Sequence, residues 1–113
     1  MKKLLLLITG WASALNLLVL NDVHLGLDET GVPRLGGNTS KELFALILAK
    51  AQKEEKIDAI LLAGDNCMHG EVNKGGSEIL YKTIAAVSEM VATHFPEIPI
   101  INSIGNNDVL SHN

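Results

Sequence analysis

The sequence has one cysteine, few aromatic residues and no excess of positive charge. Cys67 alone cannot form an intrachain disulfide, and a zinc site built mainly from cysteines is also excluded. Aromatic residues make up only 4% of the 113 residues, so the core has to be packed from aliphatic side chains. The formal charge of −4 argues against nucleic-acid binding, which usually needs a basic surface.

Glycine-rich phosphate loops are missing as well. The stretch "NDVHLGLDETG" follows the first strand-like segment and contains neither G-x-G-x-x-G nor G-x-x-x-x-G-K-[ST]. A nucleotide-binding βαβ module is therefore a minor alternative, and nucleotide binding that survives EDTA would support it. Apolar residues make up 47% of the sequence, enough for the core of a single domain.

The first residues have the layout of a secretory signal peptide. Two lysines precede the apolar run Leu4–Trp11, and the small residues Ala12-Ser13-Ala14 form a cleavage pattern. We therefore predict a signal peptide over residues 1–14, followed by one domain over residues 15–113. An uncleaved anchor over Leu4–Leu20 is an alternative, although it is shorter than the roughly 20 apolar residues that a membrane span needs.

A core strand at Lys3–Ile8 of a cytosolic protein is the other alternative for this segment. The tripeptide Asn38-Thr39-Ser40 is an N-glycosylation acceptor in a polar, glycine-rich segment and agrees with the secretory route. We accordingly expect a glycoprotein without a transmembrane segment that is secreted or resides in a lysosomal or vacuolar lumen.

Three short apolar runs alternate with two helical patterns. The runs Leu15–Leu20, Ile57–Ala63 and Ile98–Ile101 each end in Asn, Asp or Gly and read as strands buried on both faces. A capping box of Thr39 and Glu42 predicts a first helix over about residues 40–55, and the second should run from a Ser77 cap to Pro96. Their apolar stripes are Leu43, Ile47 and Ala51, and Leu80, Ile84, Val87 and Val91. The order β-α-β-α-β predicts an α/β fold with parallel strands.

Polar side chains follow each predicted strand. The segments are 21–24 (Asn-Asp-Val-His), 64–66 (Gly-Asp-Asn) and 105–108 (Gly-Asn-Asn-Asp). Because the carboxyl ends of parallel strands meet at one edge of a sheet, these groups should converge there. Two carboxylates in one crevice repel each other, and a divalent cation removes that problem. Oxygen ligands together with an imidazole suit zinc, manganese or iron.

The motifs D-x-H, G-D-N and G-N-N-D resemble those of the calcineurin-like metallophosphoesterases, in particular the branch that holds acid sphingomyelinase-like phosphodiesterases and vacuolar endopolyphosphatases. The resemblance implies a metallophosphoesterase sandwich with two divalent ions, for which we favour zinc over manganese or iron. It also implies that Asp22 and His24 bind the first ion, that Asp65 bridges both ions and that Asn106 binds the second.

The implied reaction is hydrolysis of phosphate esters or phosphoanhydrides, with Asn107 and Asp108 as catalytic residues. The substrate would be a phosphate-containing small molecule, a lipid headgroup or polyphosphate. Many members of the family have histidine where this sequence has Asn107, which cannot release a proton near neutral pH. A phosphate leaving group needs less acid assistance, so we expect a polyphosphatase-like preference. His112 is a spare candidate for the acid, and His69 could lie near the metals or the substrate.

The family's remaining metal ligands are histidines of a G-H-x-H type motif, which does not occur here. We therefore expect a truncated, β-α-β-α-β portion of the sandwich, inactive by itself. The alternative is a non-catalytic remnant or partner-binding fragment of such a domain. Cys67 is either a small loop residue or the partner of a cysteine outside these residues.

Overall fold

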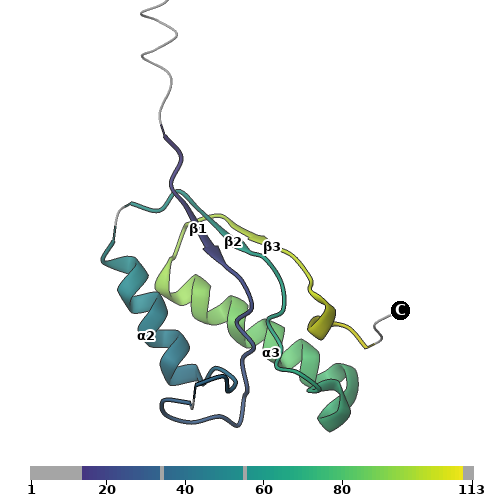
Figure 1. Ribbon diagram of the computed structural model, residues 1–113. Coiled ribbons are helices and arrows are strands. Elements are labelled where there is room, and N and C mark those ends of the chain that lie inside the picture. Colours follow the sequence, from purple (N-terminus) through teal and green to yellow (C-terminus); the bar gives the residue numbers. More distant parts are fainter. Residues whose placement is uncertain (1–13, 34, 55, 111–113) are drawn as a thin grey trace, which may run out of the picture.

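The computed structural model describes residues 14–33, 35–54 and 56–110, and Figure 1 shows how their elements are arranged. The predicted signal peptide, apart from Ala14, and the candidate acid His112 lie outside the described residues. The elements are β1 (Leu17–Leu20), α2 (Lys41–Gln52), β2 (Ala59–Leu62), α3 (Val72–His94), β3 (Ile100–Asn102) and the short 3-10 helix η1 (Asn106–Asp108).

The three strands form one parallel sheet in the order β1-β2-β3, as predicted from the alternation of apolar runs and helices. Leu18 of β1 lies opposite Ile60 of β2, which in turn lies opposite Ile100 of β3. All three strands therefore deliver the residues that follow them to the same edge of the sheet. Each strand is shorter than its apolar run: β1 and β2 each contain four residues, and β3 contains three, of which Asn102 lies beyond the predicted run.

Helix α2 begins where predicted, but with a different cap. The Ser40 hydroxyl accepts a hydrogen bond from the Leu43 N–H at 3.1 Å and so caps the helix. Thr39, the predicted cap, instead bonds its backbone N–H to the His24 carbonyl at 3.0 Å. The predicted capping box is therefore wrong, because the backbone of Thr39 is bonded to the segment after β1. The helix ends at Gln52, before the predicted end near residue 55.

Helix α3 is longer than predicted at its amino end. It begins at Val72, and Gly76, at φ 59° and ψ −144°, interrupts the helical backbone directly before Ser77. The helix ends at His94, and Phe95 and Pro96 follow it, as the sequence predicted. Leu80, Val87 and Val91 of the predicted apolar stripe are buried, whereas Ile84 is half-buried.

Both helices lie on the same side of the sheet (Figure 1), and the core lies between the helices and the sheet. It is built mainly from aliphatic side chains with two phenylalanines: Val23, Leu25, Phe44, Leu48, Ile60, Leu62, Val87, Val91 and Phe95. Side chains alternate along each strand, so some of them lie on the face of the sheet opposite the helices. Leu17, Val19 and Ile101 are 46%, 51% and 58% exposed.

The prediction that the strands are buried on both faces is therefore wrong for the described residues. The physical reason is topological. The three strands lie side by side in the same order as in the sequence, and both crossover connections have the same handedness. Both helices therefore cover one face of the sheet, and the described residues leave the other face exposed. Among the described residues, no helix combines the length and the apolar character needed to cross a bilayer.

Candidate metal centre

The segment after β1 runs alongside the segment after β2, and backbone hydrogen bonds tie the two together. The N–H of Asp22 donates to the Gly64 carbonyl at 3.2 Å, and the N–H of His24 donates to the Asp65 carbonyl at 3.0 Å. The D-x-H and G-D-N motifs thus continue the pairing of their strands beyond the sheet. This pairing fixes the positions from which their side chains project.

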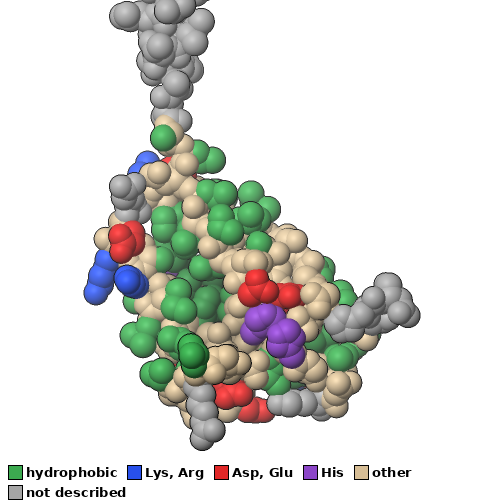
Figure 2. All heavy atoms as spheres, viewed as in Figure 1, with side chains coloured by type: hydrophobic (Ala, Val, Ile, Leu, Met, Phe, Trp, Pro, Cys, Tyr) green, Lys and Arg blue, Asp and Glu red, His purple; other side chains and the backbone are tan. Residues whose placement is uncertain are grey.

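Three of the four predicted metal ligands meet at this edge. One ligand atom each of Asp22, His24 and Asp65 lies within 4.8 Å of the others. The Nε2 atom of His24 is 3.4 Å from a carboxylate oxygen of Asp22. In Figure 2, acidic and histidine side chains adjoin at one place on the visible face.

The imidazole of His24 is oriented by a backbone group. Its Nδ1 atom lies 2.9 Å from the carbonyl oxygen of Cys67, which can only accept a hydrogen bond. Nδ1 therefore donates to this carbonyl, which leaves Nε2, the atom beside Asp22, as the ring nitrogen available to an ion. Metal-binding histidines are usually held in this way by an acceptor on the other ring nitrogen. This contact fits a divalent ion at the site.

The donor set fits a divalent ion for two further reasons. Two carboxylates and a neutral imidazole are ligands that zinc, manganese and iron accept. Asp22 and Asp65 offer oxygens only a few ångströms apart, and a cation between them would offset the repulsion of the two carboxylates.

All three of these residues have left-handed backbone conformations. The φ angles are 53° for Asp22, 45° for His24 and 52° for Asp65. Non-glycine residues adopt such angles at a cost of about 1–2 kcal/mol, and clusters of them are typical of functional sites. The strained backbone thus coincides with the three residues whose possible ligand atoms converge.

We expect an Asp22→Gly variant to be more stable than an Asp22→Ala variant by about 1 kcal/mol, because only glycine relieves the positive φ. Both variants lose the same carboxylate, so the comparison isolates the backbone term. Urea unfolding of the metal-free protein measures the difference. The matched pair at Asp28, which is exposed and not among the residues of positive φ, should show alanine at least as stable as glycine. Equal stability of the two Asp22 variants would contradict the strain.

The segment after β3 joins the site through Asn107. Its backbone N–H donates to Oδ1 of Asp65 at 3.0 Å, so Asp65 links β2 to η1. Asn106, the fourth predicted ligand, is the first residue of η1 and is exposed beside this contact. The side-chain oxygen of Asn107 lies 3.2 Å from Nδ1 of His69.

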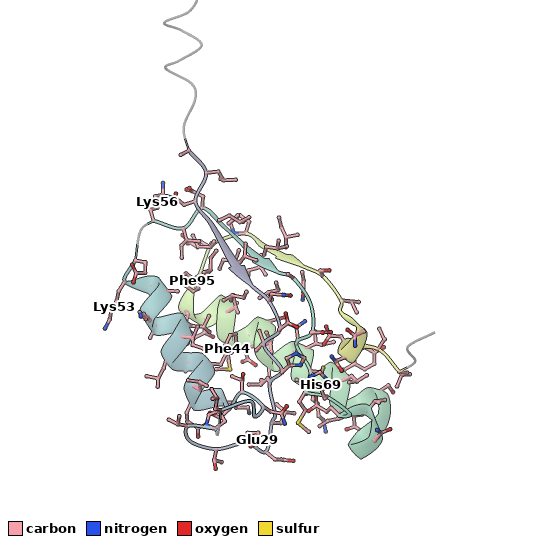
Figure 3. All side chains as sticks on the ribbon, in the orientation of Figure 1. Glu29, Phe44, Lys53, Lys56, His69 and Phe95 are labelled. Atoms are coloured by element: carbon pink, nitrogen blue, oxygen red, sulfur yellow. The ribbon has the colours of Figure 1, made fainter. Side chains whose placement is uncertain are left out.

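His69 also contacts the D-x-H motif. Its ring stacks on that of His24 with the centroids 4.5 Å apart and an interplanar angle of 26°. Figure 3 shows His69 next to η1, far from Lys53 and Lys56 at the other end of the molecule. The structure therefore brings His69 to the predicted site. His94, by contrast, ends α3, where its Nδ1 is 2.7 Å from the Met90 carbonyl oxygen.

Asp108 points into the protein and is only 6% exposed. Its Oδ1 accepts a hydrogen bond from the N–H of Cys67 at 2.8 Å. Its Oδ2 accepts from the N–H of Gly105 at 3.0 Å and from the side-chain amide of Asn66 at 3.2 Å. The carboxylate therefore ties the segment after β3 to the segment after β2.

Sequence reasoning missed the contribution of Cys67, which acts through its backbone. The N–H and the carbonyl of this residue hold Asp108 and His24, respectively, and a backbone role leaves no signal in the residue type. The thiol itself is fully buried. Burial, together with the nearby Asp108 and Glu71 carboxylates, raises the pKa of the Cys67 thiol, so the thiol stays protonated at neutral pH.

Comparison with known proteins adds two findings. The family described as "Calcineurin-like phosphoesterase" matches residues 15–113. An endopolyphosphatase from Schizosaccharomyces pombe (strain 972 / ATCC 24843) is 43% identical over 60 residues, which are 50% of this chain and 10% of the relative. The matched region thus spans about a tenth of the length of that relative.

Proposed function

Because the chain belongs to the calcineurin-like phosphoesterase family, whose members are metal-dependent hydrolases, we propose that the intact protein hydrolyses phosphate esters or phosphoanhydrides at a site that includes the cluster of Asp22, His24 and Asp65. The observation that carries this proposal is the meeting of three ligand atoms within 4.8 Å. The orientation of His24 by a backbone carbonyl supports it.

Each residue has a defined task in the proposed site. Asp22 and His24 would hold one ion, Asp65 would be shared with a second, and Asn106 would offer its side-chain oxygen to that second ion. Divalent ions held there would supply a nucleophile from water and offset the charge of the phosphoryl oxygens. We favour zinc, because imidazole and carboxylate ligands together suit it. Asp65 also holds the Asn107 backbone beside the site, which fixes the position of η1.

Asn107 supports a phosphoanhydride substrate. Its amide can donate a hydrogen bond but cannot protonate an alkoxide leaving group, whereas a phosphate leaving group needs little protonation. On the face shown in Figure 2, no lysine or arginine of the described residues adjoins the acidic and histidine side chains. Neutralisation of the substrate would thus depend on the bound cations. The resemblance to an endopolyphosphatase agrees with polyphosphate as the substrate.

An Asn107→His variant of the intact protein tests this function. Wild-type protein should hydrolyse inorganic polyphosphate in the presence of zinc and lose this activity in EDTA. The variant should hydrolyse an alkyl phosphodiester such as glycerophosphocholine faster than the wild type, because an imidazolium can protonate the alkoxide. We expect the ratio of kcat/KM values for the two substrates to shift about tenfold or more towards the diester.

An Asn73→His variant is the control, since Asn73 is exposed at the start of α3 and should leave the ratio unchanged. Equal effects of Asn107→His on both substrates would contradict the assignment of Asn107. Hydrolysis that persists after complete metal removal would contradict the proposed function itself.

We further propose that the protein enters the secretory route and acts in a lysosomal or vacuolar lumen or outside the cell. The signal-peptide pattern at residues 1–14 supports this location. Asn38, the proposed glycosylation site, lies half-buried in the loop before α2.

A further inference from the structure

We propose that Asp108 is a positioning residue that fixes the orientation of His24 through the backbone of Cys67 and does not touch the substrate. This inference rests on the proposed metal site, but not on the identity of the substrate. The proposal explains why the His24 ring has its observed orientation. Asp108, in the segment after β3, is connected through Cys67 to His24, which follows β1.

The connection consists of two consecutive hydrogen bonds. Oδ1 of Asp108 accepts from the Cys67 N–H at 2.8 Å. The Cys67 carbonyl accepts from Nδ1 of His24 at 2.9 Å. Both backbone groups of Cys67 are thereby engaged, one on each side of its Cα atom. A movement of this residue away from Asp108 would also move the carbonyl that orients the imidazole.

The second oxygen of Asp108 keeps the carboxylate in place. Oδ2 accepts from the Gly105 N–H at 3.0 Å and from the Asn66 amide at 3.2 Å. Asp65 makes the reverse connection, since its Oδ1 accepts from the Asn107 N–H at 3.0 Å. Each segment thus contributes one carboxylate that accepts hydrogen bonds from the other. Asp65, after β2, accepts from η1, and Asp108, in η1, accepts from the segment after β2. Such paired contacts hold both segments in one relative position.

The surroundings of Asp108 distinguish a positioning role from direct contact with the substrate. The side chain is 6% exposed, and each oxygen already accepts at least one hydrogen bond. Within the described part of the chain, the cluster that could hold an ion contains Asp22, His24 and Asp65 but not Asp108. Its charge is directed at N–H donors, where it strengthens hydrogen bonds.

An Asp108→Asn variant breaks the connection with little change of shape. The amide can accept from only one side, so its NH₂ group must face an N–H donor at Cys67 or Gly105. We expect zinc affinity, measured by competition with a chromophoric chelator, to fall by about tenfold to a hundredfold. The visible spectrum of the cobalt-substituted protein should change as well, because the orientation of His24 changes.

A Thr83→Val variant is the matched control. Thr83 is fully buried in α3, where its hydroxyl donates to the Ile79 carbonyl of the same helix at 2.9 Å. This variant should lower thermal stability and keep the zinc affinity and the cobalt spectrum of the wild type. If Asp108→Asn behaves in the same way, Asp108 is merely structural and the proposal is overturned.

A measurement on the wild-type protein covers the case in which Asp108→Asn does not fold. In the zinc-loaded protein, ¹⁵N NMR of the imidazoles should show a protonated Nδ1 and a metal-bound Nε2 for His24. Metal on Nδ1 would displace the Cys67 carbonyl and overturn the proposal, as would the absence of zinc binding. A wild-type protein that binds zinc with this geometry but hydrolyses no phosphate compound contradicts the proposed function alone.

Discussion

An Asp65→Ala variant of the intact protein should lose metal binding, and its kcat/KM for the phosphate substrate should fall at least about a thousandfold. The reason is that metal ions stabilise the transition state of such reactions by several kcal/mol. Asp65 supplies one of the three converging ligand atoms. It also accepts the hydrogen bond of the Asn107 N–H at 3.0 Å. The alanine variant therefore removes both a ligand and the link between β2 and η1.

An Asp65→Asn variant separates the two effects. The amide oxygen can still accept from the Asn107 N–H, while the negative charge of the ligand is gone. We expect its thermal stability to stay close to that of the wild type and its metal affinity to fall almost as far as in the alanine variant. Calorimetric titration with zinc and thermal unfolding measure the two quantities on the same samples.

Asp58→Asn provides the control for the loss of one carboxylate near β2. Asp58 precedes this strand at the opposite end from the site, where it accepts a hydrogen bond from the Asn16 N–H at 2.9 Å. Its substitution should leave zinc affinity unchanged. Full retention of zinc binding and activity in Asp65→Ala would refute the assignment of the metal centre.

The sequence predicted the family, now confirmed by the match over residues 15–113, and the parallel arrangement of the strands. The family was predicted from the resemblance of the motifs D-x-H, G-D-N and G-N-N-D, whereas the parallel strands followed from the alternation of short apolar runs with helical patterns. In a parallel sheet, Asp22 and Asp65 follow neighbouring strands and have to meet. The convergence of these ligands could therefore be inferred without coordinates.

Other features depend on contacts between distant backbone segments, which residue types do not encode. Thr39 has the chemistry of a helix cap, yet its backbone pairs with the segment after β1 and Ser40 caps α2 instead. The Cys67 carbonyl orients His24, although any residue provides a carbonyl. The exposure of Leu17 and Val19 follows from the side on which both crossovers pass, and the apolar character of β1 gave no indication of it.

The tight crossing of the segments after β2 and β3 explains the two glycines that precede Asp65 and Asn106. At Gly64, φ is +106°, and an added Cβ atom would lie 2.7 Å from the backbone nitrogen of Gly105. At Gly105, an added Cβ would lie 2.1 Å from Oδ1 of Asp65 and 2.4 Å from its backbone nitrogen. The two backbones thus touch directly, and Asp65 lies at their point of contact.

A Gly105→Ala variant should consequently weaken the candidate metal centre without removing any of its side chains. Gly105 has an ordinary φ of −96°, which alanine adopts freely, so the effect is steric and not conformational. Since the obstructing backbone cannot move aside easily, the carboxylate of Asp65 has to leave its position. We expect zinc affinity to fall by about a hundredfold or more and the free energy of unfolding by about 1–3 kcal/mol.

A Gly36→Ala variant tests the opposite case and serves as the control. At φ +79° with no atom within 4 Å of an added Cβ, Gly36 is restricted by conformation alone. This variant should lose about 1 kcal/mol of stability and bind zinc as the wild type does, because Gly36 lies in the loop before α2. Calorimetric titration and urea unfolding of both variants compare the two effects. Wild-type zinc affinity in Gly105→Ala would show that the position of Asp65 does not depend on this crossing.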